Sequence, residues 1–113
     1  MAKTVASRKA KGRNLQHIVR DKLLEAFPKL SEDDIVSVPS SVNGRDIMLS
    51  KEAQKQIPFS IECKNQERLQ IWAALKQAED NAKDLIPTLI FKRNRTKTYV
   101  VIEIDEFIKL IKP

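Results

Sequence analysis

The stretch from residue 57 to residue 64 constrains the fold of this chain more than any other. It reads IPFSIECK, in which apolar and polar side chains alternate from the phenylalanine onward. Because successive side chains of a β-strand point to opposite faces, this alternation predicts a strand with one face on a core. The opposite face carries Glu62 and Lys64, a carboxylate and an ammonium two residues apart. The apolar positions are Phe59, Ile61 and Cys63.

Glu62 and Lys64 form the only acidic-x-Lys pair in the chain. A glutamate can ligate a hard divalent cation, and a neighbouring lysine can hold a water or a phosphate oxygen. The pair therefore suits hydrolysis of a phosphodiester. The same pattern is common on solvated strand faces. The catalytic interpretation is favoured here because a strand that carries Asp46 is expected just before it, over residues 45–49.

Length and composition indicate one globular domain with a modest core. The chain has 113 residues, 42% hydrophobic and 32% charged, as in a soluble globular protein. It has no apolar run long enough to span a bilayer and no recognisable signal peptide, so we expect a cytoplasmic protein, in the host cytoplasm if a phage encodes it. One cysteine excludes an internal disulfide, and one histidine disfavours zinc, so any metal is expected to have oxygen ligands.

The net charge of +6 comes from the first twenty residues, which hold six basic side chains and no acid. The other 93 residues carry 15 basic and 15 acidic side chains, which cancel. A basic arm on a neutral body indicates a polyanion partner, most simply nucleic acid, although a solubilising tail has the same composition. The expected DNA contacts are Lys3, Arg8, Lys9, Lys11 and Arg13 in the arm, Arg45 and Asn65 beside the central strand, and Lys92, Arg93, Arg95 and Lys97 in a second basic cluster.

Hydrophobic periodicity predicts the order of the elements. After a disordered arm over residues 1–10, an apolar stripe predicts a helix over 12–27, ended by Pro28. Strands are expected over 35–38, 45–49 and 57–64, with a turn at Asn43-Gly44 and a short helix over 51–56 capped by Ser50. A helix over 69–83, strands over 85–91 and 98–104, and a final helix capped by Asp105 complete the chain. Trp72 is expected in a core or interface, and Phe107, Ile108 and Ile111 are expected to pack inward.

This order, helix, three strands, helix and strand, resembles the core of the PD-(D/E)XK nuclease superfamily. Gly44-Arg45-Asp46 on one strand and Glu62-Cys63-Lys64 on the next match its signature. The resemblance implies an α/β, restriction-endonuclease-like αβββαβ core, with a mixed central sheet flanked by helices, in a single nuclease domain over residues 11–113. It also implies that Asp46 and Glu62 bind Mg²⁺ or Mn²⁺ and that Lys64 orients the attacking water or stabilises the transition state.

Three further residues complete the expected site. The Cys63 carbonyl lies between the two side chains along the strand and is a candidate third metal ligand, whereas its thiol is expected in the core. Gln77 resembles the polar residue that many superfamily members place on the helix after the motif strand. The segment from Lys11 to Val19, KGRNLQHIV, resembles the opening of archaeal-type Holliday junction resolvases, with Gln16 and His17 where those enzymes have Glu and Arg. Because Gln lacks the charge of Glu, Gln16 is expected to hydrogen-bond a metal-bound water.

Three functions are compatible with these features. The favoured one is a Mg²⁺-dependent DNA endonuclease of phage type that acts on branched DNA. The second is a non-catalytic DNA-binding module on the same fold, against which the joint presence of Asp46, Glu62 and Lys64 argues. The third is a protein-interaction domain with a basic tail. A homodimer is expected because a four-way junction is two-fold symmetric and because the last strand and helix are rich in apolar residues.

Overall fold

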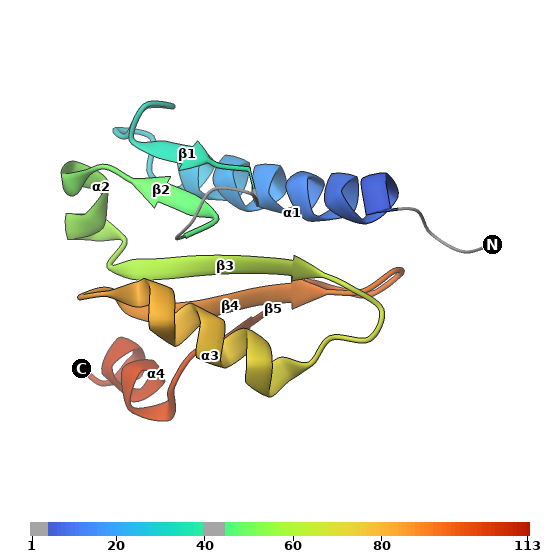
Figure 1. Cartoon of the computed structure of the whole chain (residues 1–113). Helices are drawn as coiled ribbons and strands as arrows, with labels where there is room; N and C mark the ends of the chain where they lie inside the picture. Colours follow the sequence, from blue (N-terminus) through green and yellow to red (C-terminus); the bar gives the residue numbers. More distant parts are fainter. Residues whose placement is uncertain (1–4, 40–44) are drawn as a thin grey trace.

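The central strand, β3 (Phe59–Asn65), lies between two long helices (Figure 1). The computed structural model describes residues 5–39 and 45–113. The other elements, in chain order, are α1 (Val5–Ala26), β1 (Ile35–Ser37), β2 (Ile47–Leu49), α2 (Lys51–Gln56), α3 (Ile71–Ala82), β4 (Ile86–Lys92), β5 (Tyr99–Val101) and α4 (Ile104–Ile111). The predicted α/β fold with its restriction-endonuclease-like order of elements is confirmed.

The sheet is mixed, as predicted. β3 pairs in parallel with β4, and β4 pairs antiparallel with β5. β1 and β2 form an antiparallel hairpin, which lies beside β3 because the backbone N–H of Asp46 donates to the carbonyl of Ile61 at 3.1 Å. Asp46, immediately before β2, and the strand that carries the glutamate are therefore neighbours.

The main core fills the space between α1 and the sheet. Leu15 and Val19 from α1 meet Ile47 from β2 and Ile61 and Cys63 from β3, all of them buried. The apolar positions of β3 thus face α1, as their alternation predicts. Ser50 caps α2 by accepting a hydrogen bond from the backbone N–H of Ala53 at 3.1 Å, also as predicted.

A stripe of three alanines on α3 covers the opposite face of the sheet. Ala74, Ala78 and Ala82 are buried, and their small side chains let the helix approach closely. As a consequence, the polar side of β3 is also buried, with Ser60 and Glu62 only 0% and 1% exposed. A carboxylate enclosed in this way needs a hydrogen-bond donor or a cation beside it.

Both ends of the chain differ from the predicted boundaries. α1 begins at Val5 rather than near Gly12, so residues 5–10 are helical and not part of a disordered arm. Their alanines, arginine and lysine are good helix formers. Lys3 and the Asn43-Gly44 turn lie outside the described residues. The predicted cap at Asp105 is wrong, because Glu103 caps α4 and accepts a hydrogen bond from the backbone N–H of Asp105 at 3.0 Å.

The last helix and the tryptophan are not buried. Phe107, Ile108 and Ile111 were expected to pack inward, but none of the residues of α4, all of which the structure describes, is buried. The helix follows β5 and lies to one side of the sheet, away from α1 (Figure 1). Trp72 projects from α3 and is 84% exposed, so its expected place in a core is also wrong. Of the helices described, none has the length and apolar character needed to cross a membrane.

The alternation in β2 predicts unequal effects of two neighbouring substitutions. Ile47 is fully buried, whereas Met48 on the opposite face is 44% exposed. Ile47→Ala should lower the free energy of unfolding by about 2–5 kcal/mol, because it leaves a cavity in the main core. Met48→Ala is the matched control and should change it by less than about 0.5 kcal/mol. Urea denaturation measures both, and equal losses would contradict the assigned register.

Candidate active site

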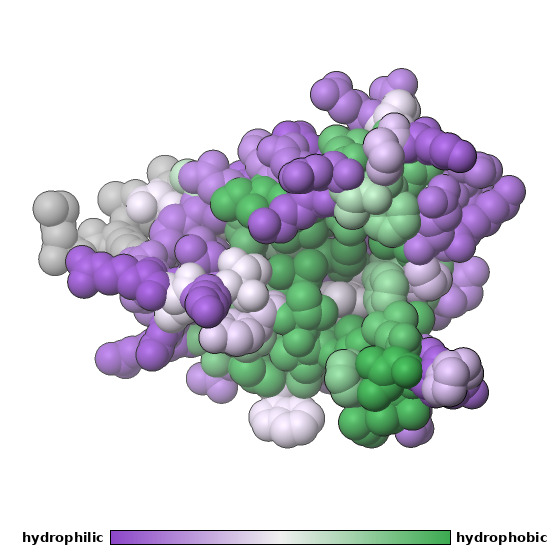
Figure 2. Space-filling model, turned by 180° about the vertical axis from the view of Figure 1, so that it is seen from behind, coloured by the Kyte–Doolittle hydropathy of each residue, from purple (hydrophilic) through white to green (hydrophobic). Residues whose placement is uncertain are grey.

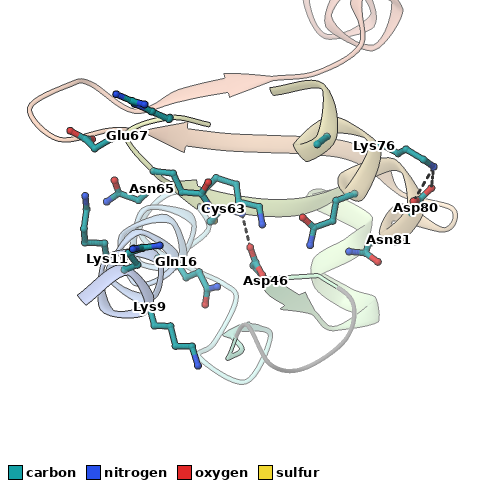
Figure 3. A pocket seen from close by; sticks show the side chains of 17 residues that line it. Lys9, Lys11, Gln16, Asp46, Cys63, Asn65, Glu67, Lys76, Asp80 and Asn81 are labelled. Carbon is teal, nitrogen blue, oxygen red and sulfur yellow. Dashed lines mark hydrogen bonds and ion pairs between the residues drawn. The ribbon is translucent and has the colours of Figure 1, made fainter. Parts of the chain in front are cut away.

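An open cleft of about 1110 Å³ lies between the first half of α1, the end of β3 and one side of α3 (Figure 3). It brings together side chains that are far apart in the sequence. The predicted residues that line it are Arg8, Lys9, Lys11, Gln16, Asp46, Cys63, Lys64, Asn65 and Gln77. The cleft therefore gathers most of the expected catalytic side chains, whereas Glu62 is not part of its lining.

Asp46 is held on β3 by two hydrogen bonds. Its backbone N–H donates to the carbonyl of Ile61, and its carboxylate oxygen Oδ2 accepts from the backbone N–H of Cys63 at 2.7 Å (Figure 3). Because main chain and side chain are both attached to the same strand, the carboxylate is fixed beside Cys63 and lines the cleft.

Glu62 lies next to this carboxylate and is buried. Its oxygen Oε1 accepts a hydrogen bond from Asn81 Nδ2 at 2.8 Å. Burial raises the pKa of Asp46. Burial, and then the negative charge of Asp46, raise the pKa of Glu62 to about 7, although the hydrogen bond from Asn81 acts in the opposite direction. The two carboxyl groups are close enough to compete for one proton.

Two mutually repelling carboxylates fit a hard divalent cation, because its charge removes both the repulsion and the cost of burial. Within residues 5–39 and 45–113, no group of three His, Cys, Asp or Glu side chains is placed to share an ion. A third protein ligand must therefore come from elsewhere. The Cys63 carbonyl fits, because the N–H and C=O of one strand residue point to the same edge and the Cys63 N–H points to Asp46.

Lys64 and the Cys63 thiol lie as their alternation predicts. Lys64 follows Glu62 by two residues on the same face of β3 and lines the cleft. Its positive charge acts to lower the pKa of both Asp46 and Glu62. The Cys63 thiol is buried, and burial raises its pKa far above the ordinary range, so it is a core side chain and not a nucleophile.

Gln16 is buried at the wall of the cleft by a small polar network. Its oxygen Oε1 accepts hydrogen bonds from Arg13 at 2.9 Å and from the Ser37 hydroxyl at 2.9 Å. Arg13 also donates to Ser37 Oγ at 3.0 Å. With its oxygen engaged twice, Gln16 can offer its amide N–H groups, which suit a phosphate or water oxygen. Arg13 thus joins Gln16 to β1, and its expected contact with DNA stays a prediction.

Asn81 is the site residue that sequence reasoning missed. Gln77 lines the cleft but is exposed, whereas Asn81, one helical turn later, donates to Glu62. The two lie four residues apart and so share a face of α3. α3 packs on the sheet through alanines. A second polar side chain four residues after Gln77, on the same face of this helix, is the sequence signal that could have identified Asn81.

Arg45, another expected DNA contact, also turns toward the protein. Its Nε donates to the Ser60 hydroxyl at 3.1 Å, and its terminal nitrogen donates to the Ala82 carbonyl at 3.0 Å. The Arg45 side chain therefore links β3 to the last turn of α3. Asn65, in contrast, lines the cleft, and its buried oxygen Oδ1 has no hydrogen-bond partner within the described residues.

The second basic cluster lies at the turn between β4 and β5. Arg93 and Arg95 line a small hollow with Arg68 and Glu67, and these last two residues also line the cleft. Lys92 ends β4, and Lys97 is exposed on the turn. Basic side chains therefore continue from α1, through the cleft, to this hairpin. That distribution matches a groove for a polyanion.

The buried Glu62 predicts that the metal-free protein loses stability as the pH rises. Its pKa of about 7 in the folded state lies above the value of about 4.3 for an unfolded chain. Protonated Glu62 therefore contributes fully to the stability of the fold below about pH 4.3. This contribution is lost as the pH rises through 7, because the side chain then ionises in its buried position. With EDTA at pH 8, Glu62→Gln should therefore unfold with a free energy roughly 1–3 kcal/mol higher than the wild type.

Glu79→Gln is the matched control, because Glu79 is an exposed glutamate of α3 that does not line the cleft. Thermal and urea unfolding at pH 5 and pH 8 measure the difference between each variant and the wild type. A Glu62→Gln protein less stable than the wild type at pH 8 would contradict the described environment of this carboxylate.

Comparison with known proteins gives one family match. The family model described as "Phage putative PDDEXK endonuclease" matches residues 7–112. Neither a curated protein nor a solved structure matches the chain. The predicted superfamily is confirmed, whereas the similarity to Holliday junction resolvases stays a prediction. Because this match covers nearly all of its length, the chain belongs to the family of that description.

Proposed function

We propose that the protein is a metal-dependent endonuclease that hydrolyses phosphodiester bonds of DNA in the described cleft. The observation that carries this proposal is the proximity of two carboxyl groups, that of Asp46, which lines the basic cleft, and that of the buried Glu62 on β3. Buried carboxylates that repel one another destabilise a fold unless they serve a bound cation. Their retention is explained by Mg²⁺ or Mn²⁺ held by Asp46, Glu62 and the Cys63 carbonyl.

The surrounding side chains have separate roles in the proposed reaction. A bound divalent ion supplies Lewis-acid chemistry and a more acidic water. Lys64 places a fixed positive charge in the cleft, where it can stabilise the extra negative charge of the phosphate in the transition state. Gln16 can donate its amide hydrogens to an oxygen of the attacking water or the phosphate. Asn81 positions Glu62.

We propose further that the substrate is branched DNA and that the enzyme works as a homodimer. The support for branched DNA is the similarity of the segment KGRNLQHIV to the opening of junction resolvases. The support for a dimer is the two-fold symmetry of a junction, which requires two cuts. A protein that binds DNA on this fold without cutting it is the alternative, and it predicts tight binding with no metal-dependent product.

Removal of one carboxylate tests the proposed function. Asp46→Asn should reduce the rate of Mg²⁺-dependent nicking by about 100-fold or more, because the cation loses a charged ligand. DNA binding should be unchanged or tighter, because a negative charge near phosphate is lost. Asp84→Asn, an exposed aspartate outside the cleft, is the matched control and should keep full activity.

The substrate is decided by a cleavage panel with Mg²⁺ or EDTA. The panel contains a four-way junction, a flap, a nicked duplex, a linear duplex and a single strand. Cleavage of junctions well above the rate for linear duplex supports branched DNA. Equal rates on all substrates would reject that specificity and leave the nuclease in place, whereas binding without any cleavage would favour the non-catalytic alternative.

The basic residues of α1 predict the salt dependence of binding. Arg8, Lys9 and Lys11 line the cleft. If they contact phosphates, replacing all three by Ala should make the slope of log affinity against log salt shallower by up to about three units. Lys22→Ala, Lys29→Ala and Lys51→Ala combined is the matched control, because these lysines are exposed and lie outside the cleft. Equal slopes for the two triple variants would remove the first half of α1 from the DNA path.

A further inference from the structure

One face of the molecule, at α4, exposes apolar side chains that no described element covers. Figure 2 shows hydrophobic surface at the end of the molecule where α4 lies, next to a hydrophobic strip along the middle of the same view. The register places Val100 beside Ile90 and Cys63 on the α1 side of the sheet. α1 packs on β1 and β3, so this side of the sheet extends beyond it.

We call this surface the α4 face. Its members share exposures between 44% and 62%. They are Val100, Ile104, Phe107, Ile108, Leu110 and Ile111. An eight-residue helix is marginal by itself in water and is normally stabilised by packing of its apolar side. In α4 the apolar side chains remain about half exposed to solvent. The helix therefore has an apolar side that is only partly packed within one chain.

We propose that a second copy of this chain covers the α4 face, with the two α4 helices packed antiparallel about a two-fold axis. The area is sufficient. Side chains of this size, about half exposed, offer on the order of 100 Å² each, or roughly 600 Å² for the six. A standard interface takes about 800 Å² from each partner, of which about 65% is apolar in homodimers, or roughly 520 Å². The α4 face therefore offers as much apolar area as one side of such an interface needs.

The charges beside the α4 face are complementary to themselves in this arrangement. Asp105 lies in the first turn of α4, and Lys112 follows its last turn. They are seven residues apart and therefore mark opposite ends of α4. In an isologous pair, a contact of Asp105 with Lys112 of the second copy occurs twice. The axis then passes near Ile108, midway between them, and the helix dipoles also oppose one another.

The proposed interface leaves both active sites accessible. The cleft is lined by α1, Asp46, the end of β3 with the segment after it, and α3. None of the six residues of the α4 face, all of which the structure describes, lines the cleft. The interface deepens the dimer proposed above and is independent of the cleavage chemistry.

The first test is sedimentation of the full chain at tens of micromolar. We expect the wild type to have twice the 13.0 kDa mass of one chain. Leu110→Glu with Ile111→Glu should weaken association at least tenfold. Trp72→Glu is the matched control, since Trp72 is the most exposed of the large apolar side chains described and lies on α3. A monomeric wild type, or a double variant as dimeric as the control, would overturn the proposal.

Disulfide cross-linking tests the position of the axis even if the double variant fails to fold. Ile108→Cys should give a covalent dimer under oxidation, whereas Trp72→Cys should not. The native Cys63 is 5% exposed and does not compete. Cross-linking through position 72 and not 108 would contradict the antiparallel arrangement. Asp46→Asn should stay dimeric in the same assays, so a failed nuclease assignment and a failed interface give different results.

Discussion

The structure of the site depends on the pair of hydrogen bonds by which Asp46 attaches to β3. The Asp46 N–H donates to Ile61, and the Cys63 N–H donates to the Asp46 carboxylate. In an ordinary sheet the second bond would go to a backbone carbonyl of the neighbouring strand. Here the Asp46 carboxylate accepts that hydrogen bond, at the point where β2 begins. The contacts that attach this segment to β3 therefore also fix the position of the carboxylate. The same arrangement places the Asp46 carboxylate beside the buried Glu62, which also accepts a hydrogen bond from Asn81.

Much of this site could be predicted from the sequence, because local patterns determine it. Alternation in β3 sets the faces of Glu62, Cys63 and Lys64, and the spacing between two strand patterns makes Asp46 their neighbour. Arg13 and Arg45 could not be assigned in this way. Each is basic in a basic region, and only the tertiary structure shows that their guanidinium groups bind Gln16 and Ser37, or Ser60 and Ala82.

Burial of the last helix is the other property that the sequence left open. Its pattern of apolar residues is the same whether the helix packs on its own sheet or on another surface. Periodicity indicates that a helix has a face to cover, and the position of neighbouring elements decides what covers it. In this chain α1 is occupied with β1 and β3, and the sheet beyond it stays open.

Arg45 has a further consequence for the electrostatics of the site. The carbonyl of Ala82 belongs to the end of α3, where the aligned peptide dipoles of a helix give a partial negative charge. That end lies one residue from Asn81, and so close to Glu62. Without compensation, the dipole would add to the field of two carboxylates. The guanidinium provides the compensating charge and ties it to the motif strand through Ser60. Because its planar fork reaches two partners in fixed directions, a lysine of equal charge could not replace it in both contacts.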